Sequence, residues 1–128
     1  MNKINETIIL LGHGSRIQGA NKILKNIAEI IKSRYDGNCI EPAFLEFAEP
    51  NINDLLENKI ALGCNHIYVI PYFLYSGNHV SRDIPEILEG FRQKYPGVRI
   101  ELGEPIGIDE RLAELVMEKI EAIKIRCY

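Results

Sequence analysis

The fold is decided by the stretch Thr7-Ile8-Ile9-Leu10-Leu11, which is followed directly by Gly12-His13-Gly14. A short, continuous apolar run with β-branched residues is typical of a strand buried on both faces of a parallel sheet. Gly12 ends the run, and the glycines on either side of His13 leave its imidazole unobstructed by neighbouring side chains. The sequence therefore predicts a central strand that presents a histidine at its carboxyl end.

The same strand and helix pattern returns three more times along the chain. Further strands are predicted at residues 39–47, 66–71 and 98–102. A stretch with apolar residues at helical spacing follows every strand, and the third of these helices is expected to begin at Asp83, with Glu86 completing its capping signature. Strands that alternate with helices predict right-handed crossovers. We therefore expect one flavodoxin-like α/β domain over residues 1–128, with a four-stranded parallel sheet flanked by helices on both faces in the order βαβαβαβα.

Composition narrows the classes of function. The chain has 128 residues, with 15 basic and 18 acidic side chains and a formal net charge of −3. There is no excess of positive charge to bind a nucleic acid or an anionic membrane, and no apolar run approaches the roughly 20 residues of a membrane-spanning helix. The three cysteines are far apart and are expected to be reduced. These features predict a cytoplasmic protein with neither nucleic acid nor membrane as a partner.

In a parallel sheet of this kind, ligands bind beyond the carboxyl ends of the strands, where the chain reverses its winding direction. His13 follows the first predicted strand, Glu46 lies at the end of the second, and His79 follows the third. If the first and third strands are neighbours, the two histidines face each other across this switch point. His66, at the entry to the third strand, is expected at the opposite end of the sheet and is given no role.

Three familiar motifs fit the first turn poorly. A dinucleotide fingerprint requires a third glycine where this chain has Ile17. A hydrolase elbow requires glycine on both sides of a serine, whereas Ser15 is followed by Arg16. A phosphate-receiver domain requires acidic residues after the first and third strands, and this chain supplies none there. None of the three classes is therefore favoured.

Two imidazoles and a carboxylate suit a divalent first-row metal ion, although a structural zinc site takes four protein ligands. A site with few ligands can pass its ion onward, and histidine can also accept protons near physiological pH. Both properties fit metal insertion into a macrocycle. The plainer interpretation is that each histidine only forms hydrogen bonds in its loop. Arg16 and Arg82 are equally compatible with surface charges and with recognition of substrate carboxylates.

The chain resembles the small sirohydrochlorin cobaltochelatases of the CbiX type, which belong to the class II chelatases. The resemblance rests on four segments spread over nearly the whole sequence: residues 10–16 (LLGHGSR), 44–50 (FLEFAEP), 69–85 (containing SGNHVSRDIP) and 103–107 (GEPIG). It implies an enzyme of the lyase class that inserts a divalent metal ion, typically cobalt, into sirohydrochlorin with release of two protons. Nickel or ferrous iron would be the metal in sister members.

The resemblance also implies roles for individual residues. His13 resembles a proton acceptor and metal ligand, His79 a second metal ligand, and Glu46 an acidic residue that faces the metal or the substrate. The loop over the macrocycle would comprise Leu74, Tyr75, Ser76, Gly77, Asn78 and His79.

No permanently bound cofactor is implied, because the metal ion is a substrate. The resemblance implies a single chelatase-like domain over residues 1–128 that is equivalent to one lobe of the two-lobed chelatases, and hence a homodimer with the cleft between subunits. A non-catalytic carrier of tetrapyrrole or metal stays open as an alternative. So do the physiological metal and the pathway, whether cobalamin, sirohaem or nickel-cofactor synthesis.

Overall fold

Strand β1 (Glu6–Gly12) lies in the interior of a four-stranded parallel sheet with the order β2-β1-β3-β4. The structure is a computed structural model that describes residues 5–35, 39–75 and 77–126. The other strands are β2 (Cys39–Phe44), β3 (His66–Pro71) and β4 (Arg99–Leu102). The expected α/β architecture is confirmed, and β1 and β3 are neighbours.

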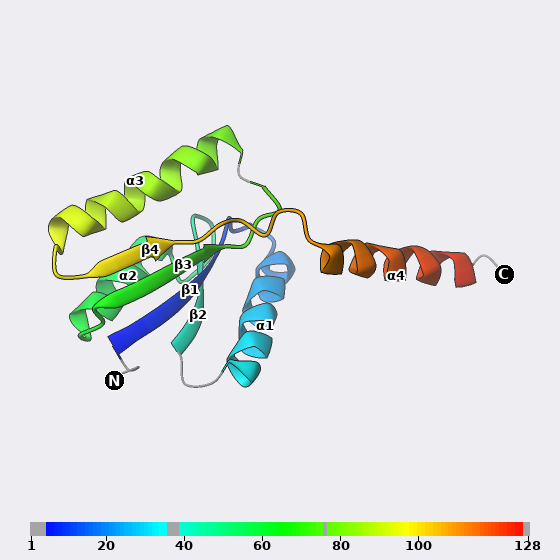
Figure 1. Cartoon of the computed structure of the whole chain (residues 1–128), viewed down its shortest axis with the longest axis horizontal. Helices are drawn as coiled ribbons and strands as arrows, with labels where there is room; N and C mark the ends of the chain where they lie inside the picture. The colour runs from blue at the N-terminus through cyan, green and yellow to red at the C-terminus, as the bar shows by residue number, and fades with distance from the viewer. Residues whose placement is uncertain (1–4, 36–38, 76, 127–128) are drawn as a thin grey trace.

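Helices cover both faces of the sheet (Figure 1). On one face, Leu10 and Phe44 pack against Leu24 and Ala28 of α1 (Gln18–Arg34). On the other face, helices α2 (Ile52–Ala61) and α3 (Asn78–Lys94) enclose the larger part of the core. Alternate residues of each strand point to opposite faces, which is why the apolar run of β1 supplies both clusters.

Two predicted boundaries were wrong. The second strand ends at Phe44 and not at Phe47, because the chain turns at Phe47, whose φ is 64°. The third helix begins at Asn78 and not at Asp83, with Gly77 as its N-cap residue, and it continues through Pro85. The spacing of Asp83 and Glu86 resembles a capping signature, but the helix begins more than one turn earlier in the sequence, at Asn78.

Helix α4 (Glu110–Arg126) leaves the carboxyl edge of the sheet and extends away from it (Figure 1). Its apolar side chains are where the sequence predicts them, but Val116, Ile120 and Ile123 are 57%, 44% and 60% exposed. No helix of the described residues is long and apolar enough to cross a membrane. Cys39 and Cys64 are free thiols, as expected, and Cys127 lies outside the described residues.

Candidate functional site

The loop after β1 carries His13 to the carboxyl edge of the sheet. His13 Nδ1 lies 3.8 Å from Glu46 Oε1, and each side chain is about half exposed. The two loops are joined by backbone hydrogen bonds, because Leu45 N donates to Gly12 O (3.0 Å) and Glu46 N donates to His13 O (3.1 Å). Pairing between the ends of β1 and β2 therefore sets the imidazole and the carboxylate side by side.

Gly14 is the residue that permits this close approach. Its φ is +98°, a conformation that residues with a side chain rarely adopt. A Cβ atom at this position would lie 1.7 Å from the carbonyl oxygen of Glu46. The second glycine of the motif is thus required by the contact between the two loops as well as by the turn itself.

Asn21 of α1 fixes the loop that carries His13 through two hydrogen bonds. Its role in the site was not predicted from the sequence. Its Oδ1 accepts a hydrogen bond from Ser15 N (2.9 Å), and its Nδ2 donates to Ser15 O (2.8 Å). The side chain is buried, on the same face of α1 as Leu24 and Ala28. An amide side chain on the otherwise apolar face of α1 was the signal in the sequence that could have indicated this buried hydrogen-bonding role.

Replacing Asn21 with leucine should remove both bonds and leave Ser15 N and O without their partner. We expect the free energy of unfolding to fall by about 1–3 kcal/mol, the usual cost of an unsatisfied buried polar group. Urea unfolding followed by circular dichroism would measure it. The matched control is Asn26→Leu on the exposed side of the same helix, which should change stability by less than about 0.5 kcal/mol. Equal losses in both variants would contradict a special role for Asn21.

A cavity of about 270 Å³ opens beside His13, bounded by Asn21 and Leu24 of α1, Phe44 of β2, and Tyr72 and Phe73 after β3. Tyr72 continues the pairing of the central strands, since its N donates to Leu11 O (2.7 Å). The loop after β3 therefore begins directly beside the His13 loop, as the predicted strand order requires.

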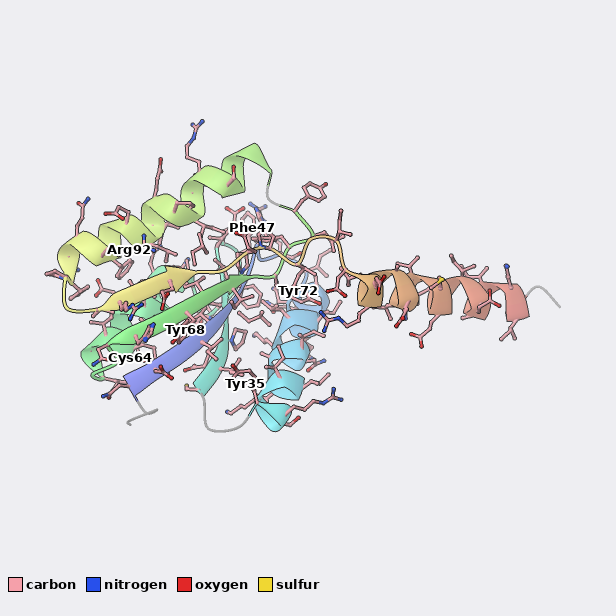
Figure 2. The ribbon with its side chains drawn as sticks, viewed as in Figure 1. Tyr35, Phe47, Cys64, Tyr68, Tyr72 and Arg92 are labelled. Atoms are coloured by element: carbon pink, nitrogen blue, oxygen red, sulfur yellow. The ribbon has the colours of Figure 1, made fainter. Side chains whose placement is uncertain are left out.

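Apolar side chains are exposed around this edge. Tyr75 and Leu74 are 79% and 62% exposed, and Phe47 is half exposed with Arg16 Cζ lying 4.5 Å from the centre of its ring. Phe47 and Tyr72 both lie at this end of the sheet, whereas Cys64 lies at the other (Figure 2). The Arg16–Phe47 pair, which sequence reasoning missed, places a cation beside an exposed aromatic ring.

The loop after β3 is tied to the segment that follows β4. Ile106 N donates to Phe73 O (2.7 Å), and Gly107 N donates to Leu74 O (3.0 Å). The motif at residues 103–107 therefore supports the loop by its backbone. This contact joins segments that are distant in sequence, and the sequence alone did not predict a structural role for residues 103–107.

Part of the expected site is not tested by the structure. Ser76 lies outside the described residues, and so do the side chains of Asn78 and His79, although these two residues form the first turn of α3 after Gly77. Among the side chains that are described, no group of three or more His, Cys, Asp or Glu residues could hold a metal ion. His13 and Glu46 are the two predicted polar site residues that the structure brings together.

His66 lies at the amino end of the sheet, as expected. Its Nε2 is 2.5 Å from Glu101 Oε2, and its Nδ1 is 3.7 Å from Glu6 Oε2. The hydrogen bond from His66 lowers the pKa of the Glu101 carboxyl. These contacts give His66 local partners of its own, far from the His13 loop.

The fold and the site together define a class: a parallel α/β domain that presents an imidazole–carboxylate pair at the carboxyl edge of its sheet. The family model of CbiX matches residues 7–123. The chain is also 34% identical over 116 residues to a sirohydrochlorin cobaltochelatase of Sulfurisphaera tokodaii, covering 91% of this chain and 92% of that one. This chain belongs to the CbiX family, which confirms the resemblance seen in its motifs.

Longer relatives contain about twice as many residues. The sirohydrochlorin ferrochelatase of Bacillus subtilis is 34% identical over 122 residues, which are 95% of this chain but 47% of that protein. The crystal structure of the sirohydrochlorin chelatase SirB from Bacillus subtilis subspecies spizizenii, in complex with cobalt, matches with a TM-score of 0.83 and 35% identity, over 92% of this chain and 50% of that chain. The CbiX protein from Marinobacter aquaeolei VT8 matches over nearly its full length, 98%, and over 94% of this chain, with a TM-score of 0.78 and 29% identity.

Proposed function

We propose that this protein is a sirohydrochlorin chelatase that inserts a divalent metal ion, with cobalt as its preferred substrate. The observation that carries the proposal is the His13–Glu46 pair, 3.8 Å apart at the carboxyl edge of the sheet in a chain of the CbiX family. Cobalt is favoured because the archaeal relatives that this chain matches along nearly their whole length are cobaltochelatases.

In the proposed reaction, the ion is held by His13 and His79 before it enters the ring. Sirohydrochlorin gives up two pyrrole N–H protons as its nitrogens bind the metal ion, so one ion enters for two protons released. Once the ion has moved to the ring, the His13 imidazole is free to accept one of these protons, and the neighbouring Glu46 carboxylate stabilises the resulting imidazolium. The second proton passes to Glu46 or His79 and then to water.

The macrocycle is proposed to lie against the exposed apolar rim, beside the segment of residues 74–79, whose last two residues belong to the first turn of α3. Flat aromatic ligands bind well to apolar walls with a few polar groups. Arg16 beside Phe47 supplies a guanidinium for a substrate carboxylate next to a ring on which the macrocycle can stack. The cavity of about 270 Å³ is below the roughly 300–1,000 Å³ of complete ligand sites, which supports a cleft closed by a second subunit.

The direct test is anaerobic incubation of the pure protein with sirohydrochlorin and cobalt, followed by absorption spectroscopy. An enzyme should form metallated product in large excess over protein sites. A single stoichiometric event would instead identify a carrier. Parallel reactions with nickel and ferrous iron rank the metal ions under the same conditions.

Glu46→Gln keeps the shape of the side chain and removes its charge. We expect cobalt insertion to slow by about 10–100-fold, the usual effect of losing a carboxylate that supports a metal-binding histidine. The control is Glu49→Gln in the same turn, which should leave the rate within about twofold. An unchanged rate in Glu46→Gln would remove the carboxylate from the mechanism.

A further inference from the structure

Basic side chains gather on and just before helix α1, which starts at the carboxyl edge of the sheet and runs back along one face (Figure 1). Residues 13–34 contain a single acidic side chain, Glu29, whereas the whole chain carries a formal net charge of −3. The basic residues of this stretch are Arg16, Lys22, Lys25, Lys32 and Arg34. The stretch is therefore positive within a chain that is negative as a whole.

Lys22 and Lys25 belong to the border of the cavity that opens beside His13. Ile23, which follows Lys22, lines this cavity. Phe44 also lines it, and Lys25 Nζ lies 5.9 Å from the centre of the Phe44 ring. Both lysine side chains are exposed. A ligand that enters the cavity from the α1 side therefore passes two ammonium groups.

These positive charges are not neutralised locally. Among the side chains that the structure describes, Arg16, Lys22 and Lys25 form no ion pair with a carboxylate. The acidic residue of the adjacent strand β2, Glu41, points to the other face of the sheet and pairs with Lys59 of α2. The first turn of α1 holds no acidic residue, so the positive end of the helix dipole adds to the same field.

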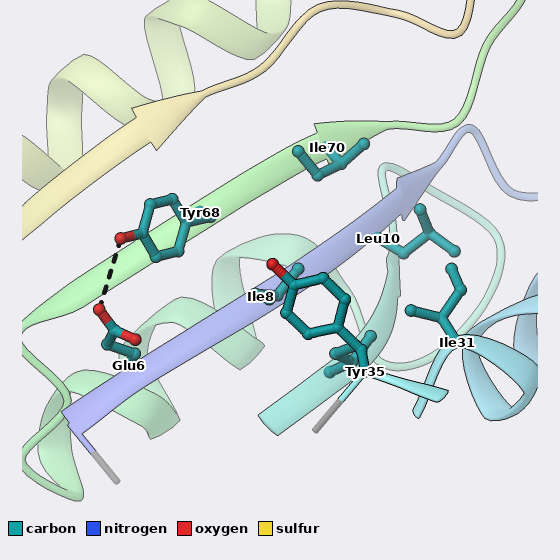
Figure 3. Close-up of a pocket in the computed structure, with 8 residues that line it drawn as sticks. Glu6, Ile8, Leu10, Ile31, Tyr35, Tyr68 and Ile70 are labelled. Atoms are coloured by element: carbon teal, nitrogen blue, oxygen red, sulfur yellow. Dashed lines mark hydrogen bonds between the residues drawn. The ribbon is translucent and has the colours of Figure 1, made fainter. Parts of the chain in front are cut away.

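The opposite flank of α1 is apolar and lies outside this basic surface. Ile31 and Tyr35 line an apolar groove of about 440 Å³ over β1 and β3 (Figure 3). Lys22, Lys25 and Lys32 recur at helical spacing on the flank toward β2. The basic side chains of this flank therefore form a stripe whose first part reaches the site.

We propose that Arg16, Lys22 and Lys25 form a basic patch that attracts a macrocycle with several carboxylates and guides it into the site. The inference rests on the proposed chelatase function. Sirohydrochlorin carries acetate and propionate groups around its ring, so a negative protein repels it at long range. Glu46 and Glu49, in the loop after β2, add negative charge near the site itself. A local positive surface overcomes this repulsion, because it raises the concentration of an anionic ligand at the entrance.

The two kinds of basic side chain contribute to different steps. Lysine is a flexible, strongly hydrated point charge, which suits attraction over a distance. Arginine forms paired hydrogen bonds with a carboxylate, which suits retention of the bound ring. Lys22 and Lys25 should therefore control the rate of association, and Arg16, beside Phe47, should hold the ring once it has arrived.

The test is the rate at which metal-free sirohydrochlorin binds the intact protein, measured anaerobically by stopped-flow absorption. At about 0.15 M salt, Lys22→Gln/Lys25→Gln should lower the association rate constant by about 3–10-fold and leave the dissociation rate constant within about twofold. Charge reversal, Lys22→Glu/Lys25→Glu, should lower the association rate constant further. At about 1 M salt, where the screening length falls to about 3 Å, the wild-type protein and both variants should associate at the same rate.

The matched control is Lys32→Gln/Arg34→Gln, which removes the same charge from the other end of α1. A rise of about 1.5 Å per residue puts Lys32 about 15 Å from Lys22 along the helix axis, beyond the screening length of about 8 Å at 0.15 M salt. The association rate constant of this control should stay within about twofold of wild type. Equal losses in the two glutamine variants would show that only net charge matters and would overturn the proposal.

Failure of this inference is distinguishable from failure of the proposed function. If the wild-type protein and Lys22→Gln/Lys25→Gln bind sirohydrochlorin at equal rates, guidance by α1 is wrong and metal insertion still stands. If the wild-type protein does not bind sirohydrochlorin, the chelatase function is wrong and this inference is wrong with it. Slower association in the variant, together with an unchanged control, supports the basic patch.

Discussion

His13→Ala is expected to slow cobalt insertion into sirohydrochlorin by at least about 1,000-fold. The imidazole is proposed to hold the ion and then to accept a pyrrole proton, and loss of a positioned acid–base group alone costs about 10²–10⁴-fold. Because the side chain is about half exposed, its removal should leave the fold intact. The measurement is the anaerobic initial rate from the absorption spectrum, with thermal unfolding as the check on folding.

The matched control for this variant is His66→Gln at the amino end of the sheet. Its contacts with Glu101 and Glu6 are remote from the site, so the insertion rate should stay within about twofold of wild type. A His13→Ala protein that turns over at the wild-type rate would exclude this residue from both proposed roles. Loss of activity in both variants would point to general damage to the protein.

Gly14→Ala is expected to remove almost all activity and to destabilise the protein by about 2 kcal/mol or more. The added methyl group would lie 1.7 Å from the carbonyl oxygen of Glu46, and alanine is strained at a φ of +98°. The His13 loop must therefore move away from the Glu46 loop, which separates the imidazole from the carboxylate. Urea unfolding and the insertion rate measure the two effects.

Gly90→Ala provides the comparison within the same chain. Gly90 lies in α3, a Cβ atom there would meet nothing within 4 Å, and alanine is preferred to glycine in a helix. This substitution should raise the free energy of unfolding by about 0.5–1 kcal/mol without changing the rate. If Gly14→Ala behaved in the same way, the close approach of the two loops would not matter for function.

The sequence predicted the elements whose signals are local. The apolar run of β1 and the helical spacing in α1, α2 and α4 depend on residues within a few positions of one another, and so does the pair of glycines around His13. Boundaries were predicted less well where two local signals compete. Gly77 and the Asp83–Glu86 pair both resemble helix starts, and the packing of Ile84 and Leu88 into the core is compatible with either.

By itself, then, the sequence determined the parallel α/β domain, the family and the presence of His13 at the end of a central strand. Only the tertiary structure decided that Gly14 touches the Glu46 backbone, that Asn21 supports the loop, and that Arg16 lies over Phe47. It also decided that α4 extends away from its own sheet. These features join residues that are distant in the chain, and their contacts depend on strand register and on the path of connecting segments, which no local pattern of residues encodes.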